Sequence, residues 1–358
     1  MHSQKEYGVW YPQIRMWLYT VFASIFTLIM IGGATRLTDS GLSITEWQPI
    51  IGIIPPITFL DWQDAFAKYQ QIPEYQLANK DTQLSEFKTI FWWEWGHRFL
   101  GRLTGLVFLI PFLYFLIHRR IGPRLMASLI ALFTLGGLQA VLGWYMVKSG
   151  LVDRVDVSQY RLAAHLALAL IILSFTLWMA RTLGRPVIPA AQRKASRTVL
   201  FVAAGISALV FLQIILGAFV AGTDAGLSYN SWPLMDGVWV PSGLLILSPI
   251  YLNFLENPLT LQFDHRILAY IIFVVSLIHL TWIARGAGEG RLLVFSSLFL
   301  LCVVLQICAG IWALLLQVPL ELGLLHQAGG VVVLLISVMQ VQESVWHRPA
   351  TDKALHKE

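Results

Sequence analysis

The hexapeptides TDSGLS at residues 38–43 and TDAGLS at residues 223–228 each follow directly on a long apolar run and precede a tryptophan, Trp47 or Trp232. The second copy lies 185 residues after the first, both at the hexapeptide and at the tryptophan. Threonine and aspartate favour caps and turns, and glycine permits a positive φ where the chain bends away. Each hexapeptide therefore predicts the end of a helix, and its repetition predicts two related halves.

The composition indicates a membrane protein. Of the 358 residues, 57% are hydrophobic and only 13% are charged, which is too little charge for a soluble surface of this size. Eight apolar runs approach or exceed the roughly 20 residues that cross a bilayer. The first run follows a polar segment without a cleavage-site pattern, so we expect it to be retained. The eight runs are residues 16–36, 92–117, 125–147, 160–180, 199–221, 264–284, 292–316 and 323–345.

The charges of the connecting segments predict the orientation in the membrane. The segments 118–124 and 181–197 are basic, whereas the long segment 37–89 is mainly acidic and 222–263 has no Lys or Arg. Positively charged loops stay in the cytoplasm. We therefore expect both termini inside and both long loops outside, with a short amphipathic helix at 58–71 in the first of them.

Further landmarks repeat between the halves. The pattern Gln-x3-Gly occurs in the third, fifth and seventh spans, at residues 139–143, 213–217 and 306–310. His97-Arg98 and His265-Arg266 open the second and sixth spans, and His165 and His326 lie near the start of the fourth and eighth. The sequence thus predicts an all-α integral membrane protein of two tandem four-helix units, residues 1–198 and 199–358, related by an axis along the membrane normal.

Four histidines, His97, His165, His265 and His326, fall at the outer ends of the even-numbered spans, one on each. A lone histidine in a membrane span is more simply a packing residue, but four at one depth, repeated as two pairs, favour a cofactor role. Two imidazoles on facing helices suit axial ligation of a haem iron, whereas zinc takes three or four protein ligands. The pattern predicts two bis-histidine haems near the outer face.

The residues beside the first histidine of each half differ between the two copies. Glu94 lies one helical turn before His97, and Gln262 occupies the matching place before His265. A carboxylate at this depth is costly, so we expect Glu94 to serve one reactive site, or else to hold the imidazole by a hydrogen bond. Arg98 and Arg266 are expected to reach haem propionates or to extend toward the membrane surface.

The chain resembles the haem A synthase family over about residues 15–345. The stretches that carry the resemblance are GGATRLTDSGLSITEWQPIIGIIPP (32–56), FWWEWGHRFLGRLTG (91–105), RLAAHLALAL (161–170), GTDAGLSYNSWPLMDG (222–237), QFDHRILAY (262–270) and LGLLHQAGG (322–330). The long first outer loop is similar to that of the alphaproteobacterial and mitochondrial branch. The cysteine pair that another bacterial branch carries in an outer loop is missing from this sequence.

The resemblance implies oxidation of the C8 methyl of haem O to the formyl group of haem A, by successive hydroxylations and loss of water. It implies that His97 and His165 bind the substrate haem, that His265 and His326 bind a resident haem b, and that Glu94 is the functional acid. Glu94 would then stabilise positive charge at the methyl carbon or take a proton from attacking water.

The resemblance also sets the expected location and partners. The enzyme is expected in the bacterial inner membrane with its haem sites near the periplasmic face. Its expected partners are haem O, membrane lipid, an unidentified electron donor, the farnesyltransferase that makes haem O and further copies of the chain; nucleic acid is not among them. Two rival functions stay open, a dihaem b-type electron-transfer cytochrome and a haem carrier, although neither needs an acid beside only one of two similar haems.

Overall fold

The protein is described by a computed structural model that covers residues 11–48, 51–153, 155–185, 188, 195–287 and 290–348. Over these residues the chain is helical, without a β-strand, and the only pairing of extended backbone is an isolated bridge between Met235 and Val238. Eight of its helices are long and apolar enough to cross a membrane, which confirms the predicted all-α membrane protein with eight spans. They are α2 (Tyr11–Leu37), α5 (Leu84–Ile117), α6 (Pro123–Asp153), α7 (Gln159–Leu183), α8 (Arg197–Gly222), α10 (Pro258–Trp282), α11 (Arg291–Leu315) and α12 (Leu320–Trp346).

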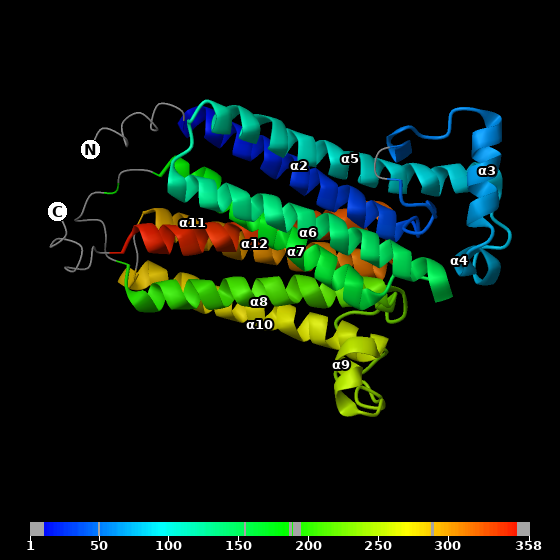
Figure 1. The fold of residues 1–358 in the computed structure, drawn as a ribbon. Helices are drawn as coiled ribbons and strands as arrows, with labels where there is room; N and C mark the ends of the chain where they lie inside the picture. Colours follow the sequence, from blue (N-terminus) through cyan, green and yellow to red (C-terminus); the bar gives the residue numbers. More distant parts are fainter. Residues whose placement is uncertain are drawn as a thin grey trace. The chain divides into compact units, whose positions relative to one another are not determined.

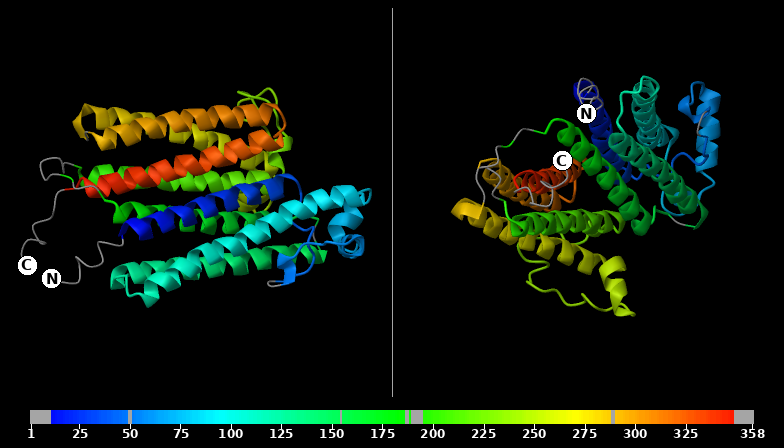
Figure 2. Two further views of the ribbon diagram at one scale, coloured as in Figure 1. Left: turned by 90° about the horizontal axis from the view of Figure 1, so that it is seen from above. Right: turned by 60° about the vertical axis from the view of Figure 1, so that its left-hand side comes forward.

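The chain forms two compact units. Of the described residues, the first unit holds those within 11–184 and 221–223, and the second holds those within 185–220 and 224–348. In the first unit α2 packs against α5 and α7, while α6 packs against α5 and α7, so the four helices run side by side (Figures 1 and 2). In the second unit α11 packs against both α10 and α12, and Ser337 of α12 donates a hydrogen bond to Ser207 of α8.

Two of the long helices begin well before the apolar runs that predicted them. Helix α5 begins at Leu84 rather than near residue 92, because Gln83 and Glu86 form a capping box that closes an additional polar turn. Helix α10 begins at Pro258 rather than near residue 264, because Asn257 caps the backbone N–H of Leu259 and proline suits the first helical position. An apolar run marks only the part of a helix that is suited to lipid.

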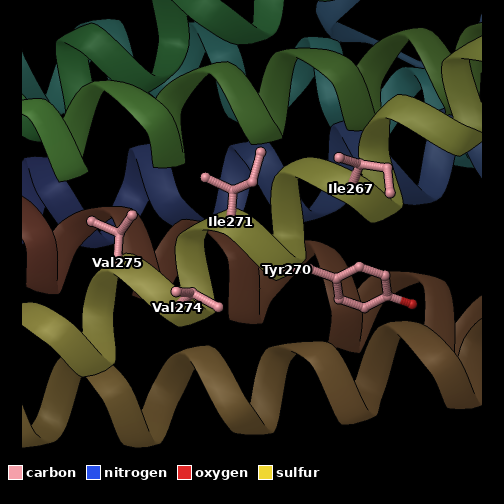
Figure 3. A pocket seen from close by; sticks show the side chains of 5 residues that line it. All are labelled: Ile267, Tyr270, Ile271, Val274 and Val275. Carbon is pink, nitrogen blue, oxygen red and sulfur yellow. The ribbon is translucent and has the colours of Figure 1, made fainter.

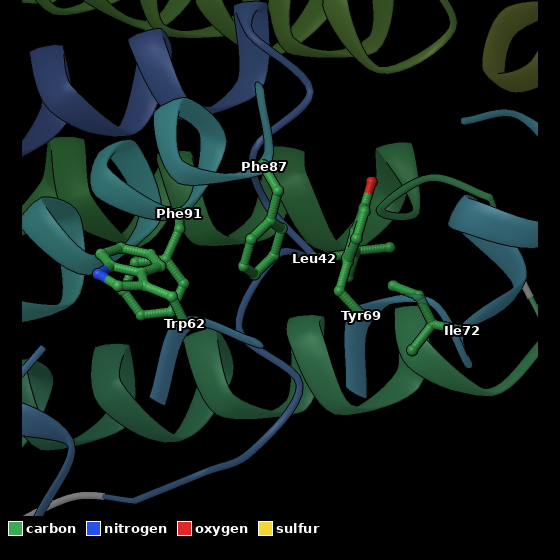
Figure 4. Packing of buried hydrophobic residues seen from close by; sticks show 6 residues of the cluster. All are labelled: Leu42, Trp62, Tyr69, Ile72, Phe87 and Phe91. Carbon is green, nitrogen blue, oxygen red and sulfur yellow. The ribbon is translucent and has the colours of Figure 1, made fainter. Parts of the chain in front are cut away.

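The long loop of the first unit packs against the start of α5. Helix α3 (Phe59–Tyr69) is the short helix that the sequence predicted at 58–71; it begins with a capping box between Thr58 and Asp61, and α4 (Pro73–Leu77) follows. Figure 4 shows the cluster that holds them, in which Trp62 and Tyr69 of α3 meet two phenylalanines of α5. Because Trp62 and Tyr69 are buried, this face of the helix packs on the protein. The cluster comprises Leu42, Trp62, Tyr69, Ile72, Phe87 and Phe91.

The two hexapeptides turn the chain at their aspartates, as the sequence predicted, but the positive φ expected at the glycines lies at the aspartates instead. Asp39 has φ 46° and Asp224 has φ 51°, the left-handed conformation that a short polar side chain tolerates. Gly226 gives room for a neighbour, since a Cβ added there would lie 3.2 Å from Val318, whereas one at Gly41 would make an ordinary contact with Val157 at 3.5 Å.

In the second unit the loop between α8 and α10 carries the short helices η3 (Ala225–Leu227), η4 (Ile250–Leu252) and α9 (Asn253–Glu256). Asn253 is fully buried and its side chain exchanges hydrogen bonds with both backbone groups of Leu247. After α10 the chain makes a π-helical turn, Ile283–Ala287, in which Gly286 has φ 106°. Arg193 and Lys194, two of the charges that predicted a cytoplasmic segment, lie outside the described residues.

Candidate functional site

Each of the four predicted histidines packs against a glycine. In every case this glycine lies on the long helix that comes just before the histidine's own helix in the chain. Any side chain at these glycines would meet the imidazole, so each glycine creates the space that the ring fills. A Cβ at Gly32, Gly143, Gly217 or Gly310 would lie 2.6, 3.0, 3.1 or 2.6 Å from the Cε1 of His97, His165, His265 or His326, respectively.

In the second unit the structure brings His265 and His326 together. Their ring centroids lie 6.2 Å apart and their planes are inclined at 70°. With a metal–nitrogen distance of roughly 2 Å on each side and about 1.1 Å from ring centre to nitrogen, imidazoles on opposite sides of one iron have centroids about 6 Å apart. The separation therefore fits two axial ligands of a single haem iron.

In the first unit His97 lies on α5 and His165 lies on α7, each against the glycine of a neighbouring helix. Both Nδ1 atoms are buried and have no hydrogen-bond partner. As whole residues, His97 and His165 are partly buried, as are His265 and His326. The two histidines of the first unit therefore receive fewer side-chain hydrogen bonds than His265 and His326 of the second unit.

The glutamines of the repeated Gln-x3-Gly pattern contact these histidines, a role that the sequence did not assign. Gln213 reaches across to His265, and Gln306 reaches across to His326. In the first unit Gln139 reaches His165. The spacing itself was the available signal, since a residue four positions before the glycine lies on the same helical face one turn away.

Glu94 lies on α5, is almost fully buried and contacts the loop that follows α2 rather than His97. Its Oε2 accepts hydrogen bonds from the Ser43 hydroxyl and the Ile44 backbone N–H, each at 2.7 Å, and its Oε1 accepts one from Arg98 at 2.5 Å. These contacts do not include the predicted hydrogen bond that would hold the imidazole.

Gln262 occupies the matching position in the second unit, but it donates a hydrogen bond to the loop where Glu94 accepts one. Its Nε2 donates to the backbone carbonyl of Ala225 at 2.8 Å, and its Oε1 accepts from Arg266 at 2.9 Å. An amide can donate to the loop, whereas a carboxylate can only accept from it. The two loops are therefore docked by groups of different charge.

Arg98 and Arg266 both anchor the loop that follows the hexapeptide. Arg98 donates to the carbonyls of Ile44 and Glu46, at 2.9 and 3.1 Å. Arg266 donates to the carbonyls of Tyr229 and Ser231, both at 2.9 Å. The sequence did not predict this anchoring; contact of either guanidinium with a haem propionate stays a prediction.

Within the described ranges no group of three or more His, Cys, Asp or Glu is placed to hold a bare metal ion. A haem iron needs only two protein ligands because the porphyrin supplies the other four. An open hollow of about 280 Å³ lies along α10 and is lined by Ile267, Tyr270, Ile271, Val274 and Val275 (Figure 3). Its lining is apolar and includes none of the predicted site residues.

The fold defines the class: a multi-pass helical membrane protein of two compact units, each with two of the predicted histidines. A family model described as cytochrome oxidase assembly protein matches residues 15–338. The chain is 49% identical to a haem A synthase of Parvibaculum lavamentivorans over 92% of this chain and 93% of that protein. It is 50% identical to one of Mesorhizobium japonicum over 90% and 87%, and 46% identical to one of Sinorhizobium fredii over 96% and 94%. The chain belongs to this family of cytochrome oxidase assembly proteins, the haem A synthases.

Proposed function

We propose that the protein is a haem A synthase, an oxidoreductase that converts the C8 methyl group of haem O into the formyl group of haem A. The pairing of His265 with His326 at 6.2 Å is the observation that carries this proposal, because the separation suits one haem iron. The similarity to haem A synthases over about nine-tenths of the chain supports it further.

The two units are proposed to divide the work as a tandem repeat. His265 and His326 hold a resident haem b, and His97 and His165 hold the substrate haem. The difference between Glu94 and Gln262 supports this division, because only the first unit places an acid one turn before its first histidine. The matched loop contacts of Arg98 and Arg266 support the repeat itself.

The residues of the first unit are proposed to orient the methyl group and to manage charge beside it. Bound haem supplies the one-electron chemistry that a side chain lacks. Glu94 presents a carboxylate fixed by three hydrogen bonds, so its charge is oriented before the substrate arrives. That carboxylate either stabilises positive charge at the methyl carbon or accepts a proton from attacking water.

The location and partners are part of the same proposal. The protein lies in the bacterial inner membrane, with both termini in the cytoplasm and the haem sites near the periplasmic face. Haem O is poorly soluble, so direct contact with the farnesyltransferase that makes it would keep it out of water. An electron donor and self-association complete the proposed set of partners.

Extraction of pigments from the purified protein tests the function. The proposal predicts haem B together with haem O and haem A, and conversion of added haem O to haem A by active membranes. Haem B alone, in two equal sites and without conversion, would instead identify an electron-transfer cytochrome. Bound haem O that is never converted would identify a carrier.

A further inference from the structure

Three glutamines reach from one long helix to a site histidine on the next. The Nε2 of Gln139, Gln213 and Gln306 donates to the backbone carbonyl of His165, His265 and His326 at 3.0, 2.8 and 2.7 Å, respectively. Each glutamine lies four residues before the glycine that accommodates the same imidazole. One helical face thus supplies both the space for the ring and a polar group beside it.

The two units differ in how far this contact extends. In the second unit the same amide nitrogen also lies 3.1 Å from the ring Nδ1, both at Gln213–His265 and at Gln306–His326. In the first unit His165 makes only the carbonyl contact. His97 has no glutamine at all, because α2 carries Leu28 four residues before Gly32. We call the amide contact with Nδ1 the glutamine clamp.

The clamp occupies Nδ1 and leaves Nε2 as the nitrogen that faces a metal. A group that binds the second nitrogen of a ligating histidine fixes the ring orientation and, as an acceptor, makes the imidazole a stronger ligand. The Oε1 atoms of Gln213 and Gln306 are buried and have no hydrogen-bond partner. A half-turn of either amide exchanges its hydrogen bond to the histidine backbone carbonyl for one to the ring. The oxygen then lies at Nδ1, where it accepts the proton that an iron-bound imidazole carries.

We propose that Gln213 and Gln306 are positioning residues that hold the imidazoles of His265 and His326 at their wide mutual angle for permanent ligation of haem. The absence of this clamp from His97 and His165 leaves the first pair free to release its haem. The inference rests on the proposed function for the identity of the two haems. It goes beyond that function by naming what makes one similar site permanent and the other exchangeable.

The test replaces each glutamine by leucine, the residue that α2 carries at the matching position. Gln213→Leu and Gln306→Leu are purified and compared with the wild type for haem b content, paramagnetic resonance of the ferric haem and midpoint potential. We expect the wild type to show the single large g value typical of steeply inclined imidazole planes. In either variant this signal should move toward the rhombic pattern of parallel planes, and haem should be retained roughly 10- to 100-fold less tightly.

The direction in which the midpoint potential changes distinguishes a hydrogen bond to Nδ1 from a role of the glutamine in packing alone. Loss of the hydrogen-bond acceptor in Gln213→Leu makes the imidazole a weaker electron donor to the iron. The midpoint potential of the haem should therefore rise. Gln213→Glu places an anionic acceptor at the same distance, so the potential should fall below that of the wild type. Shifts in the same direction for both variants, or an unchanged resonance spectrum and potential in both, would overturn the proposal.

Two further variants provide the control and the converse. Gln139→Leu removes the first unit's glutamine and should leave the resident haem's spectrum and potential unchanged; a change there would contradict the assignment. Leu28→Gln supplies the missing glutamine opposite His97 and should slow the loss of haem from the first pair. Equal retention with and without it would refute the explanation of exchange. These readouts concern bound haem, so they stand or fall separately from the haem A yield that tests the function.

Discussion

Replacement of Glu94 by glutamine gives the sharpest separation of chemistry from loop docking. The carboxylate accepts from Ser43 and Ile44 on one oxygen and from Arg98 on the other. In Glu94→Gln one oxygen remains, and the contacts of Gln262 indicate that it would stay with the arginine. The new NH₂ group then faces the Ile44 backbone N–H, and two donors oppose each other.

The free-energy cost of Glu94→Gln to the docking of the loop follows from these contacts. A buried donor left without an acceptor costs about 1–3 kcal/mol, and the bond to Arg98 loses about 1 kcal/mol when its acceptor loses its charge. The loop contact is therefore weakened by about 2–4 kcal/mol, roughly a 30- to 1000-fold shift in the docking equilibrium. Hydrogen exchange of the backbone at residues 40–47 measures this shift. We expect the variant to keep its haem b and to lose most conversion of haem O.

Ser43→Ala is the matched control. It removes one hydrogen bond from the same oxygen, costs about 0.5–1.5 kcal/mol, and leaves the carboxylate in place. It should loosen the loop measurably and keep most of the haem A yield, whereas Gln262→Glu in the second unit should have a milder effect on yield than Glu94→Gln. If Ser43→Ala loses as much product as Glu94→Gln, Glu94 acts only through the loop and its proposed chemical role is wrong.

Three further predictions address the topology, the outer loop and the haem pocket. A cysteine at the exposed Ser228 should react with an impermeant thiol reagent in intact spheroplasts, and one at His118 only after lysis; the reverse order would contradict the orientation. Burial raises the pKa of Glu74 from 4.5 to about 8, so the folded loop keeps a proton that the unfolded loop loses, and its stability should fall as the pH rises from about 4.5 to about 8. Glu74→Gln should flatten this dependence in proteolysis of the loop and the exposed control Asp81→Asn should not, while equal pH profiles would refute the assignment. Gly310→Ala should lower haem b content, because its Cβ would lie 2.6 Å from the imidazole; full haem content would show that the ring is not confined there.

The sequence predicted the eight spans because burial in lipid demands long apolar runs, whatever the packing between helices. It also predicted the histidines as two pairs from their repeated positions, and the structure places His265 opposite His326. The start of α5 was missed because polar turns stabilised by a capping box carry no apolar signal.

The contacts around the histidines could not be predicted from spacing. Spacing places Glu94 on the same face as His97, yet its carboxylate binds the loop, because the rotation of a helix against its neighbours decides which partner a side chain meets. The same limit applies to Arg98, which binds loop carbonyls. Gln213 was visible only as a landmark of the repeat, because its partner lies 52 residues further along the chain.

The haem b content of purified single-histidine variants tests the division of labour most directly. Pyridine-haemochrome spectra would be recorded for His97→Ala, His165→Ala, His265→Ala and His326→Ala, together with the yield of haem A. A resident cofactor needs permanent ligation, so His265→Ala and His326→Ala should lower haem b content. The other two variants should keep most haem b and make no haem A. Loss of haem b from His97→Ala together with its retention in His265→Ala would reverse the assignment of the two sites.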